Sequence, residues 1–228
     1  MVPTMVLVAD DSRNAQRREA LHGLAEAVAD RGEVPVTPAF GTPEEVAATV
    51  HGVQGPKVVV PAFVAGGDVA SAHMLSRIGL SELRDSCHTP PLGAVPSIVA
   101  DMATRLAESG WNRQDGVVLA ADGATGADER TVVTDVARML SRRLGSPVQV
   151  GYLRAWAPSV SDAVDRLRRG GLDGHGNVAV AAWRMVDGPD FDLLRSLDVT
   201  AITSPLWPSE LVVDTLLAQH RTAKGRLV

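Results

Sequence analysis

Short apolar runs alternate with longer amphipathic segments along the whole chain. The run VVVPAF at residues 58–63 is apolar at every position, which is typical of a strand buried between two helix layers, and such strands are usually parallel. The segments between the runs carry apolar residues at helical spacing, as Leu21, Leu24 and Val28 do. This alternation predicts an α/β fold built on parallel sheets.

The same order of elements occurs twice in the 228 residues. Strands are predicted at residues 5–9, 34–40, 57–63, 116–121, 149–154, 177–183 and 199–203, with a short strand or a loop at 90–95. Helices are predicted at about 13–31, 43–54, 69–80, 96–109, 128–144, 159–169 and 190–197, and after 208–209. The repeat predicts two similar doubly wound domains of the flavodoxin or Rossmann kind, at 1–112 and 113–228. Ligands of such sheets bind beyond the carboxyl ends of the strands, so the expected site is the cleft between the halves.

Composition excludes several classes of function. The net charge of −5 does not favour binding to nucleic acid. The only cysteine, Cys87, excludes an internal disulfide and a zinc site built from several cysteines. No stretch approaches the ~18 consecutive apolar residues of a membrane span, and no secretory signal is visible, so we expect a cytoplasmic protein without a membrane partner. A monomer and a homodimer both remain open.

Two common chemistries do not fit the motifs. VADDSRN at residues 8–14 is similar to the start of a response-regulator receiver, in which paired acids after the first strand bind magnesium. That reading needs a phosphate-accepting acid at the end of the third strand, and none occurs between Glu45 and Asp68. No G-x-G-x-x-G follows a strand and no Walker A sequence is present, so a nucleotide site is not predicted.

Four motifs together point to a known family. They are VADDSRN at 8–14, VVVPAFVAGGDV at 58–69, PLGAVP at 91–96 and VVLAADGAT at 117–125. In these motifs the chain resembles the sirohydrochlorin chelatases, the class II chelatases that insert cobalt in cobalamin synthesis or iron in siroheme synthesis. The resemblance covers nearly the whole length. It implies a two-lobed fold, a tetrapyrrole-like ligand, Co²⁺ or Fe²⁺ as the metal substrate, and a lyase activity.

Both histidines of the family's metal site are missing, which marks the chain as a divergent member. Asp10 and Asp68 stand at the matching positions, and the resemblance implies that they are the metal ligands and the catalytic bases. Carboxylates favour Mn²⁺ or Mg²⁺ more than imidazole does, and with an ordinary pKa near 4 they are weak bases at neutral pH. A changed metal site and a loss of metal insertion both explain the exchange.

Two places on the chain are candidates for holding a ligand carboxylate. Ser12 and Arg13 stand at a predicted helix start, where they would bind such a group or act as an N-cap and a solvated arginine. Arg184 directly follows a buried strand, and it would pair with a ligand carboxylate or with Asp187.

The remaining candidates each have a structural alternative. Gly66 and Gly67 would let the backbone approach a ligand closely, or they simply turn the chain into a helix. Phe63 and Trp183 stand at matching strand ends, where they would cover a macrocycle or pack in the core. His73, a few residues after Asp68, would add a metal ligand or lie inert on a helix face.

Three functions follow from these residues. The first is a divergent chelatase, with Asp10 and Asp68 in the cleft. The second is a non-catalytic carrier or regulatory protein that binds a tetrapyrrole or a metal. The third is a chelatase scaffold recruited to other metal-dependent biosynthetic chemistry.

Overall fold

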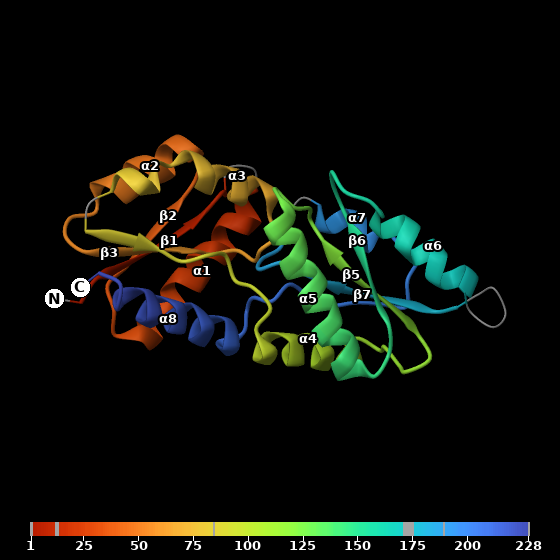
Figure 1. The fold of residues 1–228 in the computed structure, drawn as a ribbon. Helices are drawn as coiled ribbons and strands as arrows, with labels where there is room; N and C mark the ends of the chain where they lie inside the picture. The colour runs from red at the N-terminus through yellow and green to blue at the C-terminus, as the bar shows by residue number, and fades with distance from the viewer. Residues whose placement is uncertain (1, 12–13, 84, 171–175, 189, 228) are drawn as a thin grey trace.

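Two parallel four-stranded sheets form the framework of the molecule (Figure 1). The computed structural model describes residues 2–11, 14–83, 85–170, 176–188 and 190–227. The first sheet holds β1 (Thr4–Ala9), β2 (Val36–Phe40), β3 (Lys57–Pro61) and β4 (Ser86–His88). The second holds β5 (Gly116–Ala121), β6 (Val148–Tyr152), β7 (Val178–Ala182) and β8 (Ala201–Ile202). The orders are β2-β1-β3-β4 and β6-β5-β7-β8, so the second sheet repeats the first. The predicted α/β fold class and internal repeat are confirmed.

The helices begin close to where the sequence predicts them. They are α1 (Ala15–Gly32), α2 (Pro43–Gly52), α3 (Val69–Arg77), α4 (Pro96–Glu108), α5 (Ala127–Leu144), α6 (Val160–Gly170), α7 (Phe191–Arg195) and α8 (Glu210–Lys224), with a 3₁₀ turn η1 at Leu80–Glu82. Thr42 and Glu45 form a capping box at the start of α2. The N-cap of α1 is Asn14, whose side chain accepts from two backbone N–H groups. The helix therefore begins two residues later than predicted, and the predicted cap, Ser12, lies outside the described residues.

The fourth strand lies before residues 90–95, where the sequence predicted a short strand or a loop. The loop alternative is correct for that segment. β4 occupies Ser86–His88 and pairs in parallel with β3, whereas residues 90–95 carry only an isolated bridge between Leu92 and Val64. The segment Pro90–Pro91 cannot donate backbone hydrogen bonds to a ladder, which explains why regular pairing stops before it. This proline segment instead leads the chain from the first half into the second.

Successive residues of β1 face opposite sides of the first sheet, and each side is covered by two helices. Met5 and Leu7 pack with apolar residues of α1 and α8, while Val6 and Val8 pack with those of α2 and α3. All four strand residues are fully buried. The strand is therefore apolar on both faces because it forms the middle of three layers.

The last helix of each half packs on the sheet of the other half. In the second sheet, one face packs with apolar residues of α4 and α5 and the other with those of α6 and α7. Helix α4 thus covers the second sheet, and α8 returns to cover the first beside α1 (Figure 1). One continuous apolar core runs through both halves as a result. Separate domains at 1–112 and 113–228 remain a prediction.

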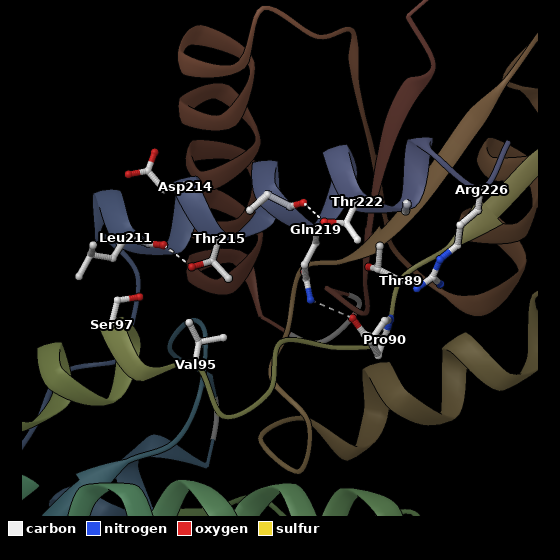
Figure 2. A pocket seen from close by; sticks show the side chains of 12 residues that line it. Thr89, Pro90, Val95, Ser97, Leu211, Asp214, Thr215, Gln219, Thr222 and Arg226 are labelled. Atoms are coloured by element: carbon white, nitrogen blue, oxygen red, sulfur yellow. Dashed lines mark hydrogen bonds between the residues drawn. The ribbon is translucent and has the colours of Figure 1, made fainter. Parts of the chain in front are cut away.

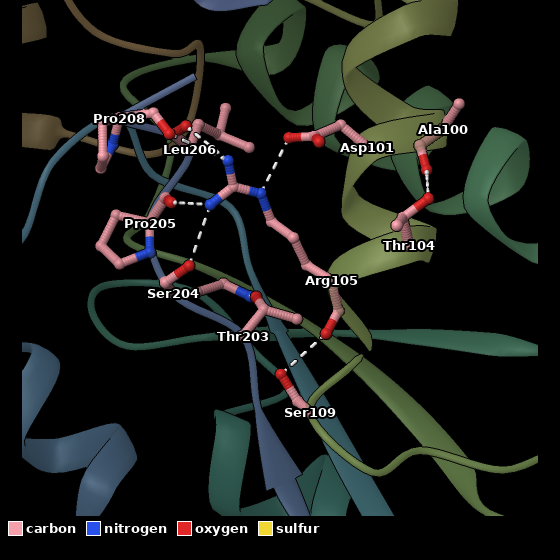
Figure 3. Close-up of polar contacts among 11 residues, drawn as sticks. Ala100, Asp101, Thr104, Arg105, Ser109, Thr203, Ser204, Pro205, Leu206 and Pro208 are labelled. Atoms are coloured by element: carbon pink, nitrogen blue, oxygen red, sulfur yellow. Dashed lines mark hydrogen bonds and ion pairs between the residues drawn. The ribbon is translucent and has the colours of Figure 1, made fainter. Parts of the chain in front are cut away.

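Arg105 ties α4 to the second half (Figure 3). Its Nε donates to Asp101 at 2.8 Å on the same helix. Its terminal nitrogens donate to four oxygens of the segment that leads into α8, namely Ser204 Oγ at 2.9 Å, Pro205 O at 2.8 Å, Leu206 O at 3.1 Å and Pro208 O at 3.3 Å. The planar guanidinium serves all these acceptors at once, which a lysine cannot do.

Helix α8 is held to the first half by polar contacts as well as by apolar packing. Gln219 donates to the carbonyl of Pro90 at 3.3 Å (Figure 2), and the Ala223 carbonyl accepts from the Cys87 thiol at 3.3 Å. At the other end, Arg31 of α1 pairs with Asp214 at 2.6 Å. Among the described residues, no helix combines the length and hydropathy needed to cross a membrane.

We expect the buried His220 of α8 to make stability depend on pH. Its Nε2 lies 3.1 Å from the Pro3 carbonyl oxygen, and burial lowers the pKa of His220 below its ordinary value of 6.5. Because the unfolded chain binds the proton at higher pH than the folded chain, this stability is complete above about pH 6.5 and is lost as the pH falls toward the lower pKa. Urea unfolding of the wild type should show a free energy of unfolding that falls between pH 7 and pH 5.5.

The matched control for this pH effect is His73, which is exposed on α3. His73→Gln should keep the loss of stability at low pH, whereas His220→Gln should remove that part of it. Equal pH dependence in the two variants would show that His220 is not responsible.

Candidate functional site

The carboxyl ends of the central strands of both sheets meet at one small cavity. Asp10 follows β1, Asp68 lies beyond β3, Asp122 follows β5 and Arg184 lies beyond β7. Their side chains line a cavity of about 40 Å³ together with Arg17, Ala70, Arg154, Gly188 and Asp190. Parallel sheets place ligand sites at this edge. Asp10 and Asp68, predicted to face a common cleft, do line the same cavity.

Both oxygens of the Asp68 carboxylate already have partners in neighbouring groups. Oδ1 accepts the backbone N–H of Ser71 at 3.0 Å, which makes Asp68 the N-cap of α3. Oδ2 accepts the Ser71 hydroxyl at 2.6 Å and pairs with Arg17. These three partners fix the orientation of the carboxylate at the edge of the cavity that it lines.

Arg17 is the residue that the sequence reading missed. It is only 9% exposed, and besides Asp68 its Nε donates to the backbone carbonyl of Asp10 at 2.7 Å. It continues the buried stripe of α1, four residues before Leu21 and seven before Leu24. A charged residue in the apolar stripe was the available signal, since such a residue needs a buried partner.

Asp122 connects the second half to α3 of the first. Its Oδ2 accepts the backbone N–H of Val69 at 2.9 Å, while Oδ1 accepts no hydrogen bond among the described residues and lies 3.6 Å from Arg154 Nε. Burial raises the pKa of Asp122, and the nearby Arg184 acts in the opposite direction. Arg154 also pairs with Asp190, across the same cavity.

Arg184 is a buried cation whose hydrogen-bonding capacity is largely unused. It is 6% exposed, and its Nε and Nη1 have no hydrogen-bond partner among the described residues. Burial lowers the pKa of Arg184, opposed by the charges of Asp122 and Asp68. Asp187, the alternative partner considered from the sequence, pairs with Arg195 at 2.9 Å. Arg184 is thus balanced by nearby carboxylates without bonding to them, and its free N–H groups suit an anionic ligand.

The glycine pair after β3 is approached by the other half of the chain. The Gly66 carbonyl accepts the N–H groups of Asp122 at 3.0 Å and Gly123 at 3.2 Å. Gly66 has φ +74°, and a Cβ on Gly67 would lie 2.5 Å from the Trp183 carbonyl oxygen. Both positions therefore require glycine for the contact between the halves. Their role toward a ligand remains a prediction.

The two aromatic candidates lie inside the protein. Trp183 is fully buried, and its indole N–H donates to the Ala65 carbonyl at 2.8 Å, which makes another bond between the halves. Phe63 is also buried, with its carbonyl accepting from Leu92 at 3.1 Å. The packing of both rings agrees with the core alternative, and covering a macrocycle stays a prediction.

Comparison with known proteins finds solved structures that have a similar fold. No protein-family model and no curated protein matches the chain. Two solved structures are similar to it over nearly their whole lengths. SirB from Bacillus subtilis with Fe³⁺ has a TM-score of 0.73 and 17% identity, with 99% of this chain and 97% of that one covered. The chain has a chelatase-like fold.

The second similar structure is CbiX, described as the terminal enzyme for biosynthesis of siroheme in denitrifying bacteria. Its TM-score is 0.66 and its identity 16%, over 97% of this chain and 99% of CbiX. The fold that the sequence resemblance implied is therefore confirmed. At such low identity the likeness concerns the chelatase-like fold alone.

Among the described residues, the site does not contain a ready-made metal-binding group. Across the described part of the chain, no three His, Cys, Asp or Glu side chains gather into a metal-binding group. Both oxygens of Asp68 already have partners, and His73 lies on the exposed side of α3, outside the cavity. Ser12 and Arg13 lie outside the described residues. The metal and catalytic roles predicted for Asp10, Asp68 and His73 remain untested.

The charges around the cavity nearly cancel. Four carboxylates, those of Asp10, Asp68, Asp122 and Asp190, face three guanidinium groups, those of Arg17, Arg154 and Arg184. Their formal sum is three minus four, or −1. Arg17 is committed to Asp68 and Arg154 to Asp190, which leaves Arg184 as the cation able to take a new anionic partner.

Proposed function

We propose that this protein is a chelatase-fold binder of a tetrapyrrole-like polycarboxylate that does not insert metal into its ligand. The observation that carries the proposal is Arg184, a buried guanidinium at the shared strand edge with two nitrogens that have no hydrogen-bond partner among the described residues. Acetate and propionate arms of a modified tetrapyrrole are suitable partners for such a group.

The binding reading is supported over metal insertion by the state of Asp68. Insertion needs a group that receives pyrrole protons and a metal held beside the ring. Asp68 already accepts two hydrogen bonds from Ser71 and pairs with Arg17, so a pyrrole proton or a metal ion would compete with these partners for its oxygens.

The size of the cavity limits what enters it. A volume of about 40 Å³ holds a few water molecules or one carboxylate group, not a macrocycle. The proposal therefore places one carboxylate arm of the ligand against Arg184 and the ring outside the cavity.

The test is an absorbance titration of the purified protein with sirohydrochlorin, without and with Co²⁺ or Fe²⁺. We expect a saturable spectral shift on binding and a metal-insertion rate equal to that of the protein-free mixture. Arg184→Gln should weaken binding about 10-fold or more, as expected for losing a charged hydrogen bond. Arg195→Gln, which removes an exposed arginine paired with Asp187, is the matched control and should bind normally.

A missing spectral shift would contradict the proposal, as would normal binding by a folded Arg184→Gln variant. The alternative is metal insertion, with Asp10 and Asp68 as bases or ligands of Co²⁺ or Fe²⁺, or of Mn²⁺ or Mg²⁺ in changed chemistry. It is favoured by the one cavity that both side chains line. A protein-dependent insertion rate that Asp10→Asn abolishes would support this alternative.

A further inference from the structure

A second hollow lies apart from the strand-edge site, between α8 and the segment that follows β4. It has a volume of about 570 Å³, within the range of small-molecule sites. We call it the α8 groove; it is lined by Thr89, Pro90, Val95 and Ser97 on one side and by residues of α8 and its end, Leu211 to Arg226, on the other (Figure 2). The groove shares no residue with the cavity around Arg184.

Two buried polar atoms at the α8 groove have no partner among the described residues. Thr89 is 4% exposed, and while its backbone N–H donates to the Val59 carbonyl at 3.0 Å, its Oγ1 bonds to nothing. Gln219 donates through Nε2 to the Pro90 carbonyl, but its buried Oε1 accepts no bond. Buried polar groups are almost always paired, so two unpaired ones lining one hollow point to a polar occupant.

The other polar side chains of α8 at this groove are already engaged. The Thr215 hydroxyl donates to the Leu211 carbonyl at 2.7 Å and the Thr222 hydroxyl to the Ala218 carbonyl at 3.0 Å. Asp214 pairs with Arg31. The unused capacity is therefore concentrated at the end of the groove near Thr89 and Gln219.

Arg226 gives this end of the groove a positive charge. Its side chain reaches from beyond the end of α8 toward Thr89 (Figure 2), and no ion pair links it to another described residue. The Arg226 and Thr89 donors suit a carboxylate, and the Gln219 oxygen suits a hydroxyl or N–H donor. Pro90, Val95 and further apolar side chains of the lining suit an apolar body.

We propose that the α8 groove binds a small amphipathic monocarboxylate that carries one hydroxyl or N–H donor. Its carboxylate lies between Arg226 and Thr89, its donor meets Gln219 Oε1, and its apolar part runs along α8. The occupant contacts both segments that cross between the halves, so binding stabilises the whole fold by mass action.

Indole-3-propionate is a suitable probe because it combines a carboxylate, an apolar ring and one N–H. Calorimetric titration of the full chain should give a Kd of about 1 mM or tighter at one site. Indole-3-propionamide, which lacks the charge, should bind about 10-fold more weakly or not at all.

Two variants locate the probe, and two more serve as controls. Arg226→Gln and Thr89→Val should each weaken binding about 10-fold. Arg221→Gln changes an exposed arginine of α8 that does not line the groove, and it should bind as the wild type does. Arg184→Gln should also leave binding unchanged, which separates this site from the strand-edge cavity.

The proposal is overturned if the probe shows no saturable binding. It is also overturned if folded Arg226→Gln and Thr89→Val variants both bind it normally. A crystal structure grown with the probe that shows only water at Thr89 and Gln219 would have the same meaning.

Discussion

Replacing Asp68 with alanine is expected to lower the free energy of unfolding by about 3–5 kcal/mol, because it removes one member of a buried ion pair. The change leaves Arg17 without its carboxylate in a place where both side chains are only 10% exposed. It also removes the N-cap of α3 and the acceptor of the buried Ser71 hydroxyl. Chemical denaturation followed by circular dichroism measures the effect.

Thr42→Ala is the matched control for this change. Thr42 caps α2 as Asp68 caps α3, but it does so at the surface and without an ion pair. Its loss should cost about 1 kcal/mol. If Asp68→Ala costs no more than Thr42→Ala, the ion pair with Arg17 does not stabilise the fold, and a catalytic role for Asp68 becomes the better explanation of its position.

Gly67→Ala is expected to destabilise the protein by about 3 kcal/mol or more, at the upper end of the cost of overpacking. The added methyl would overlap Val64 Cγ2 and lie 2.5 Å from the Trp183 carbonyl oxygen. The second contact is with backbone, which cannot rotate away as the end of a side chain does. Loss of near-ultraviolet circular dichroism from Trp183, along with an early unfolding midpoint, would report separation of the halves.

Gly52→Ala provides the comparison. Gly52 is the last residue of α2, and a Cβ there meets no atom within 4 Å. This variant should be as stable as the wild type or slightly more stable, since alanine is the better helix former. Normal stability of Gly67→Ala together with weaker ligand binding would favour the ligand role for this glycine.

The sequence predicts the layers of the fold well, but it predicts poorly which helix packs on which sheet. Apolar runs such as VVVPAF report burial on both faces of a strand, which is a local property. Which helix covers a given face is not a local property. The apolar stripe of α8 would pack against either sheet, so the hydrophobic patterns of α4 and α8 do not show that these helices cover each other's sheets. The proline pair at Pro90 likewise reads as part of an apolar run, although its missing N–H groups exclude regular pairing.

The sequence indicated where the candidate residues lie, but not which groups they contact. Strand ends located Asp10, Asp68 and Arg184 at one edge, because parallel strands all end on the same side. The partners of these groups were harder to predict. Arg17 reaches Asp68 because of how α1 packs on the sheet. Gly66 contacts the other half of the chain, and the sequence could not show this because close approach to a ligand and to a second backbone both require glycine.

The exchange of α4 and α8 also constrains the order of events during synthesis. The first sheet is translated before the second, but α8, the helix that completes one of its faces, follows every strand of the second sheet. Before α8 is translated, Met5, Leu7 and their neighbours are covered only by α1. Helix α4 likewise has no sheet to pack on until the second sheet is translated. The nascent chain therefore cannot finish the first lobe before it makes the second, and its apolar surface needs protection until α8 emerges.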